Sequence, residues 1–230
     1  MSETIIKPIA HIYTEFKEKF GIPRQSGRVK SALGKIVFTP KFRNIDALRG
    51  LDGFNYLWLI FDFSLSHTDE WSPTVRPPRL GGNTRMGVFA TRSPFRPNPL
   101  GLSSVKIENI ENTPDKGPVI TVSGVDLLDG TPIFDIKPYI PFSDSHLDAV
   151  GGFSEEHSSH RLKVDFPDRL KNGLSCDVNS LIDCLAEDPR PSYQNDSNRV
   201  YSMRYGDYDI RFKVENDLLT VIAIDKKSTD

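Results

Sequence analysis

The sequence predicts a mainly β protein, with a small N-terminal β-barrel followed by a small α+β domain. Over residues 1–140, short apolar runs alternate with turn residues, and almost no helical pattern lies between them. A polar stretch follows, and after it come one amphipathic segment and three alternating runs. We therefore expect a β-barrel domain over residues 1–145, a linker over 146–160 and an α+β domain over 161–230.

The strands of the barrel are predicted from runs of β-branched and aromatic residues. The most apolar run, residues 54–63, is expected to be a central strand that is buried on both faces. Asn44 can cap one helical turn that ends before Gly50. The expected strands cover residues 5–13, 33–39, 54–63, 86–90, 102–110, 118–125 and 132–136.

The C-terminal domain is predicted from one helix and one meander. Residues 177–187 place Val178, Leu181, Ile182 and Leu185 on one helical face, and Asp177 can cap that helix. Residues 200–205, 209–214 and 218–224 alternate strongly and are separated by turn residues, which indicates a three-stranded meander.

Composition places the chain among cytoplasmic proteins. Its 230 residues contain no apolar run near the roughly 18 residues that span a bilayer. The N-terminus lacks the basic and apolar regions of a signal peptide. The two cysteines, Cys176 and Cys184, are expected in one helix, too far apart to pair, which indicates reduced thiols.

Charge is unevenly distributed along the chain. Residues 1–140 hold 18 Lys and Arg against 14 Asp and Glu, whereas residues 141–230 hold 11 against 17. Two basic segments, residues 20–49 and 71–104, can form one patch for a polyanion if they face the same way.

The most constrained stretch is residues 86–103. Pro94, Pro97 and Pro99 fix the backbone there, so no helix can pass through it. The segment is therefore expected to be a stiff loop that presents Arg92 and Arg96. Such a loop can recognise an anion, or its arginines can simply be solvated.

Motifs for cofactors and metals, and one acidic segment, narrow the classes of enzyme that the chain can belong to. No glycine-rich dinucleotide motif or P-loop occurs, and the five histidines show no metal-ligand spacing. Asp126 and Asp129 follow an expected strand, either as a β-turn or as acceptors for a cationic ligand.

Several long motifs resemble the TrmO family, also called TsaA-like or YaeB-like. They read PRQ at 23–25, RPPRLGGNxRMGVFATR at 76–92, RxxFRPNPxGLS at 92–103 and DLLDGTPIFDIKPYIPFSD at 126–144. The stretch AEDPRPSY at 186–193 is similar to the C-terminal domain of the bacterial members.

The resemblance implies a tRNA methyltransferase that uses S-adenosylmethionine on a β-barrel instead of a Rossmann sheet. It implies transfer of a methyl group to N6 of N6-threonylcarbamoyladenosine (t6A) at position 37, next to the anticodon of threonine tRNA (tRNA-Thr), giving m6t6A. It also implies a homodimer with no metal ion.

The resemblance also implies which side chains hold the cofactor. These are Pro23, Arg24, Gln25, His67, Arg92, Leu102, Asp126, Leu127, Leu128 and Asp129. The carboxylate of the cofactor needs a pair of hydrogen-bond donors, which the guanidinium of Arg92 or Arg24 can supply in bidentate form.

The acceptor nitrogen needs a general base, because its lone pair is delocalised. Asp126 is the first candidate, and Tyr139 is the alternative or a positioning hydroxyl. Arg92 can instead stabilise charge on the carbamoyl oxygen. The sequence does not decide between the two uses of Arg92.

The tRNA phosphates are expected to meet basic and amide side chains of the barrel domain. These are Lys19, Arg28, Lys30, Arg76, Arg79, Arg85, Arg96 and Asn98. Arg96 and Asn98 can equally hold the proline-rich loop together.

Two other functions compete with a methyltransferase. A non-catalytic RNA-binding barrel predicts no affinity for S-adenosylmethionine. A metal-dependent nucleotide hydrolase that uses Asp126 and Asp129 predicts Mg²⁺-dependent activity.

Overall fold

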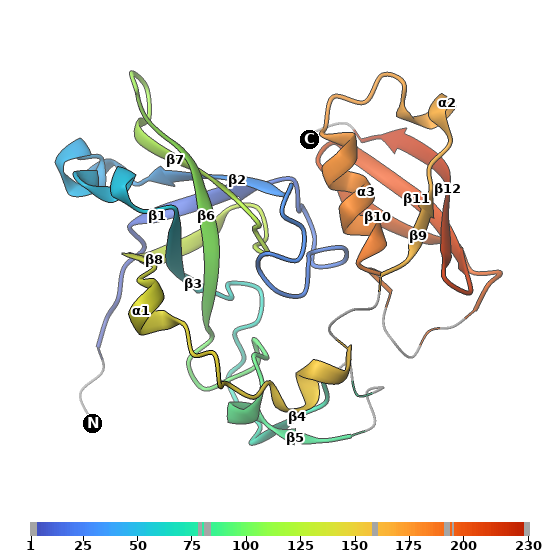
Figure 1. Ribbon diagram of the computed structural model, residues 1–230, viewed down its shortest axis with the longest axis horizontal. Coiled ribbons are helices and arrows are strands. Elements are labelled where there is room, and N and C mark those ends of the chain that lie inside the picture. Colours follow the sequence, from blue (N-terminus) through green and yellow to red (C-terminus); the bar gives the residue numbers. More distant parts are fainter. Residues whose placement is uncertain are drawn as a thin grey trace.

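The protein consists of a six-stranded closed barrel and a four-stranded sheet covered by one helix (Figure 1). In the computed structural model, the described residues are 4–77, 80, 84–157, 161–190, 194 and 196–227. The mainly β fold predicted from the sequence is confirmed.

All neighbouring strands of the barrel run antiparallel, in the order β1-β2-β7-β6-β3-β8. Their bounds are β1 Ala10–Thr14, β2 Leu33–Phe38, β3 Tyr56–Asp62, β6 Leu100–Thr113, β7 Gly117–Ser123 and β8 Thr131–Pro138. The long strand β6 pairs with β3 through its first half and with β7 through its second half.

Strand β3 is buried on one face only, so the expectation of two buried faces is wrong. Leu57, Leu59 and Phe61 are buried in the barrel, whereas Tyr56 is exposed and Trp58 half-buried. The reason is geometric: side chains alternate across a strand, and a closed barrel fills only its inside.

The expected strand at residues 86–90 is also wrong in extent and place. Strand β5 covers only Met86–Gly87, and it pairs with β4 Thr74–Val75 outside the barrel. The next three residues, Val88–Ala90, form a 3-10 turn. The first strand likewise begins at Ala10 and not at Ile5.

Short helical turns connect these strands. The 3-10 turn Ile45–Leu48 is capped as predicted, because the Asn44 side chain accepts a hydrogen bond from the Asp46 amide. Two more turns lie at Pro40–Phe42 and Leu51–Gly53. Helix α1 Pro141–Asp144 is held against the barrel by a hydrogen bond of 2.9 Å from Trp58 Nε1 to Asp144 Oδ2.

The C-terminal domain contains helix α3 Val178–Ala186 on a sheet of order β10-β11-β12-β9. Asp177 caps α3 as predicted, and the three expected strands are β10 Tyr201–Tyr205, β11 Tyr208–Glu215 and β12 Leu218–Lys226. The three-residue strand β9 Lys163–Asp165 joins β12 in parallel and was not predicted. The remaining elements are α2 Asp168–Lys171 and the 3-10 turn Gly152–His157.

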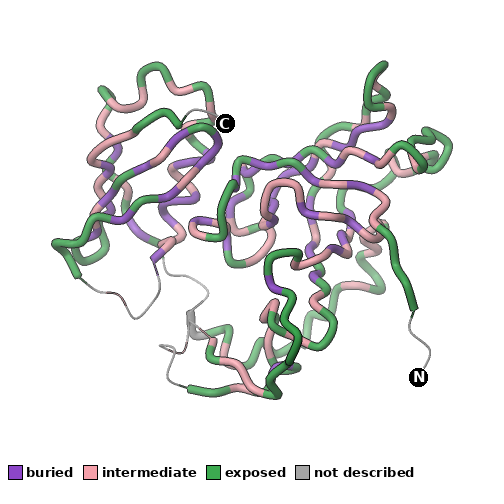
Figure 2. Tube along the Cα trace, turned by 180° about the vertical axis from the view of Figure 1, so that it is seen from behind, coloured by how far each residue is buried: buried purple, intermediate pink, exposed green. Residues whose placement is uncertain are grey.

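Burial follows the two domains. Buried positions concentrate along the barrel strands, α3 and the C-terminal sheet, whereas the segments between β3 and β6 are mostly exposed (Figure 2).

Both thiols are free, but Cys176 precedes the cap of α3, so the two cysteines do not share that helix. Within the described part of the chain, no helix is both long and apolar enough to cross a membrane.

Candidate functional site

A cavity of about 730 Å³ opens at one end of the barrel. Four chain segments line it: the loop after β1, the end of β3 with the residues that follow, the proline-rich stretch, and the segment after β7. Its volume lies within the range of pockets that hold nucleotide-sized ligands.

Hydrogen bonds from within the proline-rich stretch and from the end of β3 hold this stretch in place. Arg96 Nη1 donates hydrogen bonds to the carbonyl oxygens of Thr91 at 3.1 Å and Ser93 at 3.4 Å. The Phe63 amide donates to the Pro99 carbonyl oxygen at 2.8 Å. These bonds favour the structural role for Arg96, although its side chain also lines the cavity, as does Asn98.

Asp126 supplies a buried carboxylate to the cavity. Among the described residues, its Oδ1 atom has no hydrogen-bond partner. Burial raises the pKa of Asp126 to about 6, against the opposing effects of the Ser103 hydroxyl, the Ser26 and Asp126 backbone and the Arg92 charge. Asp126, which lines the cavity, is therefore a buried carboxylate with one oxygen outside any hydrogen bond of the described residues and with a pKa raised toward neutral pH.

Two arginines lie on the cavity wall. Arg92 Nη1 donates a hydrogen bond of 2.6 Å to Gln25 Oε1, which joins the proline-rich stretch to the loop after β1. Arg24 Nη2 donates to the Arg190 carbonyl oxygen at 2.9 Å. Arg92 and Arg24 are both exposed, so each guanidinium can still reach a ligand.

Most of the predicted cofactor residues line this one cavity. They are Pro23, Arg24, Gln25, Arg92, Leu102, Asp126, Leu127 and Leu128. The sequence placed these residues in three segments, and only the closed barrel brings those segments together.

Asp129 and Tyr139 are not among the residues that line it. Asp129 accepts from the Thr14 amide at 2.8 Å and pairs with Lys17 at 2.8 Å, so it fixes a turn. The Tyr139 ring packs on Trp58 and Tyr56, with centroids 5.5 and 6.3 Å apart. Both side chains therefore have structural contacts within this chain, and their expected roles stay predictions.

His67 reaches the cavity only through Asp62. Its Nε2 lies 2.7 Å from Asp62 Oδ1, and Asp62 lines the cavity. The sequence reasoning missed Asp62, a second carboxylate of the site. The available signal was its place at the polar end of the most apolar strand.

The expected phosphate-binding residues divide into three groups. Lys19 lines the cavity and donates to the Leu65 carbonyl oxygen at 2.7 Å. Arg28 forms an ion pair with Glu187, and its expected contact with a phosphate stays a prediction. Lys30, Arg76 and Arg85 are exposed, and Arg79 lies outside the described residues.

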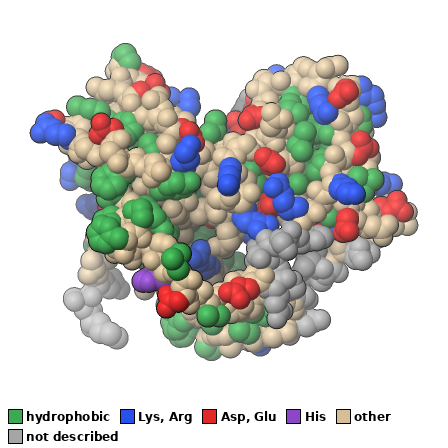
Figure 3. Space-filling view, in the orientation of Figure 1, with side chains coloured by type: hydrophobic (Ala, Val, Ile, Leu, Met, Phe, Trp, Pro, Cys, Tyr) green, Lys and Arg blue, Asp and Glu red, His purple; other side chains and the backbone are tan. Residues whose placement is uncertain are grey.

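In the view of Figure 3, Lys and Arg side chains gather where the barrel domain meets the C-terminal domain.

Among the described residues, no three His, Cys, Asp or Glu side chains are grouped as a metal site requires.

The comparisons with known proteins identify the family. The profile of the tRNA-methyltransferase O N-terminal domain matches residues 11–145, and that of the TrmO C-terminal domain matches residues 159–227. This chain belongs to the TrmO family. The resemblance seen in the sequence motifs is thereby confirmed.

Relatives of known name cover nearly the whole chain. A tRNA (adenine(37)-N6)-methyltransferase of Escherichia coli is 38% identical, over 99% of this chain and 100% of its own. A putative S-adenosylmethionine-dependent methyltransferase RcsF of Pseudomonas aeruginosa is 38% identical, over 95% and 96%. A crystal structure of TrmO from Pseudomonas aeruginosa superposes with a TM-score of 0.75 at 32% identity, covering 98% of this chain and 100% of that one.

Proposed function

We propose that this protein is a tRNA (adenine-N6)-methyltransferase that acts at position 37. Its substrate would be t6A in tRNA-Thr, its product m6t6A, and its donor S-adenosylmethionine. The observation that carries the proposal is the buried carboxylate of Asp126, with one oxygen lacking a hydrogen-bond partner among the described residues, in a cavity that Arg92 also lines. Near full-length similarity to the Escherichia coli enzyme supports the reaction class.

The residues of the cavity fit the proposed donor. S-adenosylmethionine combines a positive sulfonium, an adenosine and an amino-acid end that carries both charges. Asp126 offers a negative partner, Arg92 and Arg24 offer positive ones, and Phe61 and Leu102 add apolar surface. When bound, the cofactor supplies an electrophilic methyl group.

Asp126 is the proposed general base. With a pKa of about 6, it is mostly ionised at pH 7 yet still basic enough to accept a proton. The Asp126 carboxylate would take the hydrogen of N6 as that nitrogen becomes nucleophilic. Tyr139 is the weaker candidate, because its ring packs on Trp58 and Tyr56 and does not line the cavity.

Arg92 has two proposed roles that differ in their kinetics. If it binds the carboxylate of the donor, Arg92→Ala raises KM for the donor. If it stabilises negative charge on the carbamoyl oxygen, the same substitution mainly lowers kcat. Gln25, which accepts a hydrogen bond from Arg92, would orient the guanidinium in both cases.

The tRNA would bind through its anticodon arm, against the exposed basic side chains around the cavity. The protein would act in the cytoplasm as a homodimer, with the cavity near the subunit interface. Each of these statements extends the reaction proposed above and depends on it.

Two measurements test this function. Isothermal titration should detect binding of S-adenosylmethionine, and methyl transfer should occur with tRNA-Thr that carries t6A and fail with unmodified tRNA. Absence of donor binding would instead favour a non-catalytic RNA-binding barrel. Mg²⁺-dependent cleavage of nucleotides would favour a hydrolase.

A further inference from the structure

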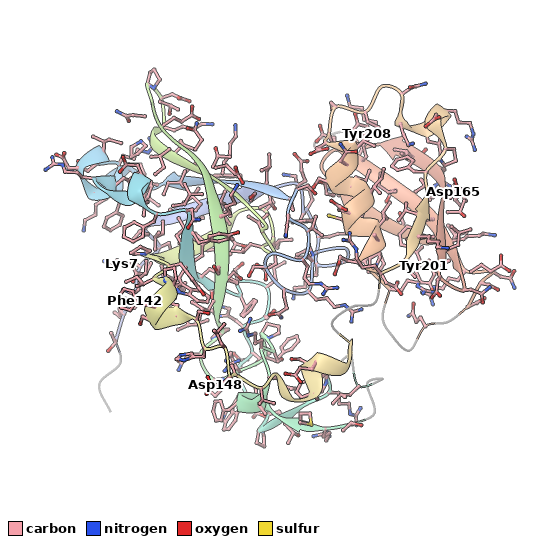
Figure 4. The ribbon with its side chains drawn as sticks, in the orientation of Figure 1. Lys7, Phe142, Asp148, Asp165, Tyr201 and Tyr208 are labelled. Carbon is pink, nitrogen blue, oxygen red and sulfur yellow. The ribbon has the colours of Figure 1, made fainter. Side chains whose placement is uncertain are left out.

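One loop of the barrel contributes to the cavity on one side and packs against the C-terminal domain on the other. Residues 15–32 connect β1 to β2, and Lys19, Ile22, Pro23, Arg24 and Gln25 line the cavity. In Figure 4 this blue loop lies between the barrel and the domain that carries the labelled Tyr201 and Tyr208. Both domains therefore determine the conformation of this loop.

The apolar side of the contact is tight. The Phe20 ring stacks on Phe212 with centroids 6.5 Å apart. A Cβ atom at Gly21 would lie 2.2 Å from the Met203 sulfur, so only glycine fits there. The Gly206 amide also donates a hydrogen bond of 2.7 Å to the Glu15 carbonyl oxygen. The first part of the loop is thus packed directly on the C-terminal sheet.

The polar side of the contact centres on Glu187, at the C-terminal end of α3. Arg28 Nε lies 2.6 Å from Glu187 Oε2, and Arg161 Nε lies 3.5 Å from Glu187 Oε1. The Glu187 side chain is only 9% exposed. Oε1 makes no hydrogen bond among the described residues, so the contact to Arg28 is the hydrogen-bonded one. Removing one partner of a nearly buried ion pair costs far more than removing one partner of an exposed pair.

Asp183, one helical turn before Glu187, adds a second contact. Ser31 Oγ donates to Asp183 Oδ2 at 2.8 Å, and Arg161 Nη2 pairs with Asp183 Oδ1 at 3.0 Å. Residues four apart on a helix share a face, so α3 presents both carboxylates to the same loop. Arg161 contacts both of them and links them into one network.

The same loop links its contacts with the C-terminal domain to the cavity. Gln25 lies three residues before Arg28, and its Oε1 accepts the hydrogen bond from Arg92. Arg24 is tied to the Arg190 carbonyl oxygen, and Arg190 is itself buried and held by Asp188 at 2.8 Å. Two cavity residues therefore depend on how the C-terminal domain holds the loop.

We propose that Glu187 is a positioning residue of the donor pocket, acting through Arg28 and the loop that carries Arg24 and Gln25. The C-terminal domain then sets the affinity of the cavity without lining it. The inference rests on the proposed function for the identity of the ligand, S-adenosylmethionine, but the geometry of the loop is independent of it.

The test is Glu187→Gln in the full chain, which keeps the shape of the side chain and removes its charge. We expect the Kd for S-adenosylmethionine to rise about tenfold, within the usual range of coupling between sites. KM for the donor should rise likewise, with kcat at saturating donor unchanged. In the protein without ligand, amide hydrogen exchange should accelerate across residues 22–31.

Asp225→Asn is the matched control. It also removes one acidic partner of an arginine in the same domain, the exposed Arg211–Asp225 pair on the sheet. This variant should leave both the Kd and the exchange of residues 22–31 as in the wild type. If Glu187→Gln does not fold, Arg28→Gln tests the same contact from the barrel side, with the same expected result.

An unchanged Kd, or unchanged exchange in the loop, overturns the positioning role. If the wild type does not bind S-adenosylmethionine, the proposed function fails. The exchange of residues 22–31 in the two variants then decides whether Glu187 holds the loop.

Discussion

The two domains each bury a carboxylate, and they treat it in opposite ways. In the barrel, Asp126 reaches a cavity with Oδ1 lacking a hydrogen-bond partner among the described residues, and burial raises its pKa to about 6. In the C-terminal domain, Glu187 Oε1 also lacks a hydrogen-bond partner among the described residues, but the Glu187 carboxylate forms ion pairs with Arg28 and Arg161. A buried carboxylate outside any ion pair costs stability and is available for chemistry, whereas an ion-paired one fixes structure.

The sharpest test of this contrast is Asp126→Asn. Because the amide cannot accept a proton, turnover should fall roughly a hundredfold or more, while binding of S-adenosylmethionine survives. Single-turnover methyl transfer measures the rate, and isothermal titration measures the binding. Turnover near that of the wild type would remove Asp126 from the role of base.

The same substitution should raise stability at pH 8. The folded-state pKa of Asp126 is raised, so the cost of burying its charge is absent below the ordinary value of 3.8 and complete above about 6. Asparagine carries no charge at any pH. Thermal unfolding should therefore show a higher midpoint for the variant at pH 8, and a lower one would contradict the raised pKa.

At the Glu187 ion pair, by contrast, removing a charge should lower the stability of the protein. Arg28→Ala removes one partner of the nearly buried Glu187 and should lower the free energy of unfolding by about 3 kcal/mol. Urea denaturation measures this loss. Arg49→Ala is the control, since the Arg49–Asp46 pair is largely exposed and its loss should barely change stability.

The pH dependence of turnover tests whether the Asp126 carboxylate acts in its ionised form. If Asp126 must be ionised, kcat/KM, which reports the pKa values of the free enzyme, should be level above about pH 6 and fall about tenfold for each pH unit below it. The profile of the Asp126→Asn variant should lack this limb. A limb that persists in the variant would assign the titration to another group.

The smallest expected effect concerns the exposed basic side chains. Arg85 donates to Thr74 Oγ1 at 2.7 Å and is otherwise exposed. If it contacts one tRNA phosphate, Arg85→Ala should reduce the slope of log K against log salt by about 0.7 to 0.9. Arg211→Ala, on the C-terminal sheet, should leave that slope unchanged, and equal slopes for all three proteins would exclude the contact.

Elements with a strong local signal were predictable from the sequence. Asp177 caps α3, and Asn44 caps its 3-10 turn, because a capping side chain bonds backbone amides two or three residues away. The C-terminal meander follows from the alternation along each strand. Strand β9 was missed because three residues carry too little pattern, and its pairing with β12 is long-range.

The site was predictable only in part. Its motifs pointed to Arg92, Gln25 and Asp126, which line one cavity. Sequence proximity did not reveal that the Asp129 carboxylate bonds Thr14 and Lys17 of a distant strand and turn. Nor did it reveal that the Tyr139 ring packs on Trp58 of the neighbouring strand.

The sequence by itself determined the strands, caps and stiff loops, because these depend on contacts within a few residues. It also contained the motifs that mark the family. Only the tertiary structure decided which charges are paired and which are left for a ligand: Arg28 meets Glu187 across 159 residues of chain, whereas Asp126 Oδ1 has no hydrogen-bond partner among the described residues. Charge pairing depends on distances and burial that exist only once the barrel has closed and the C-terminal domain has packed against it.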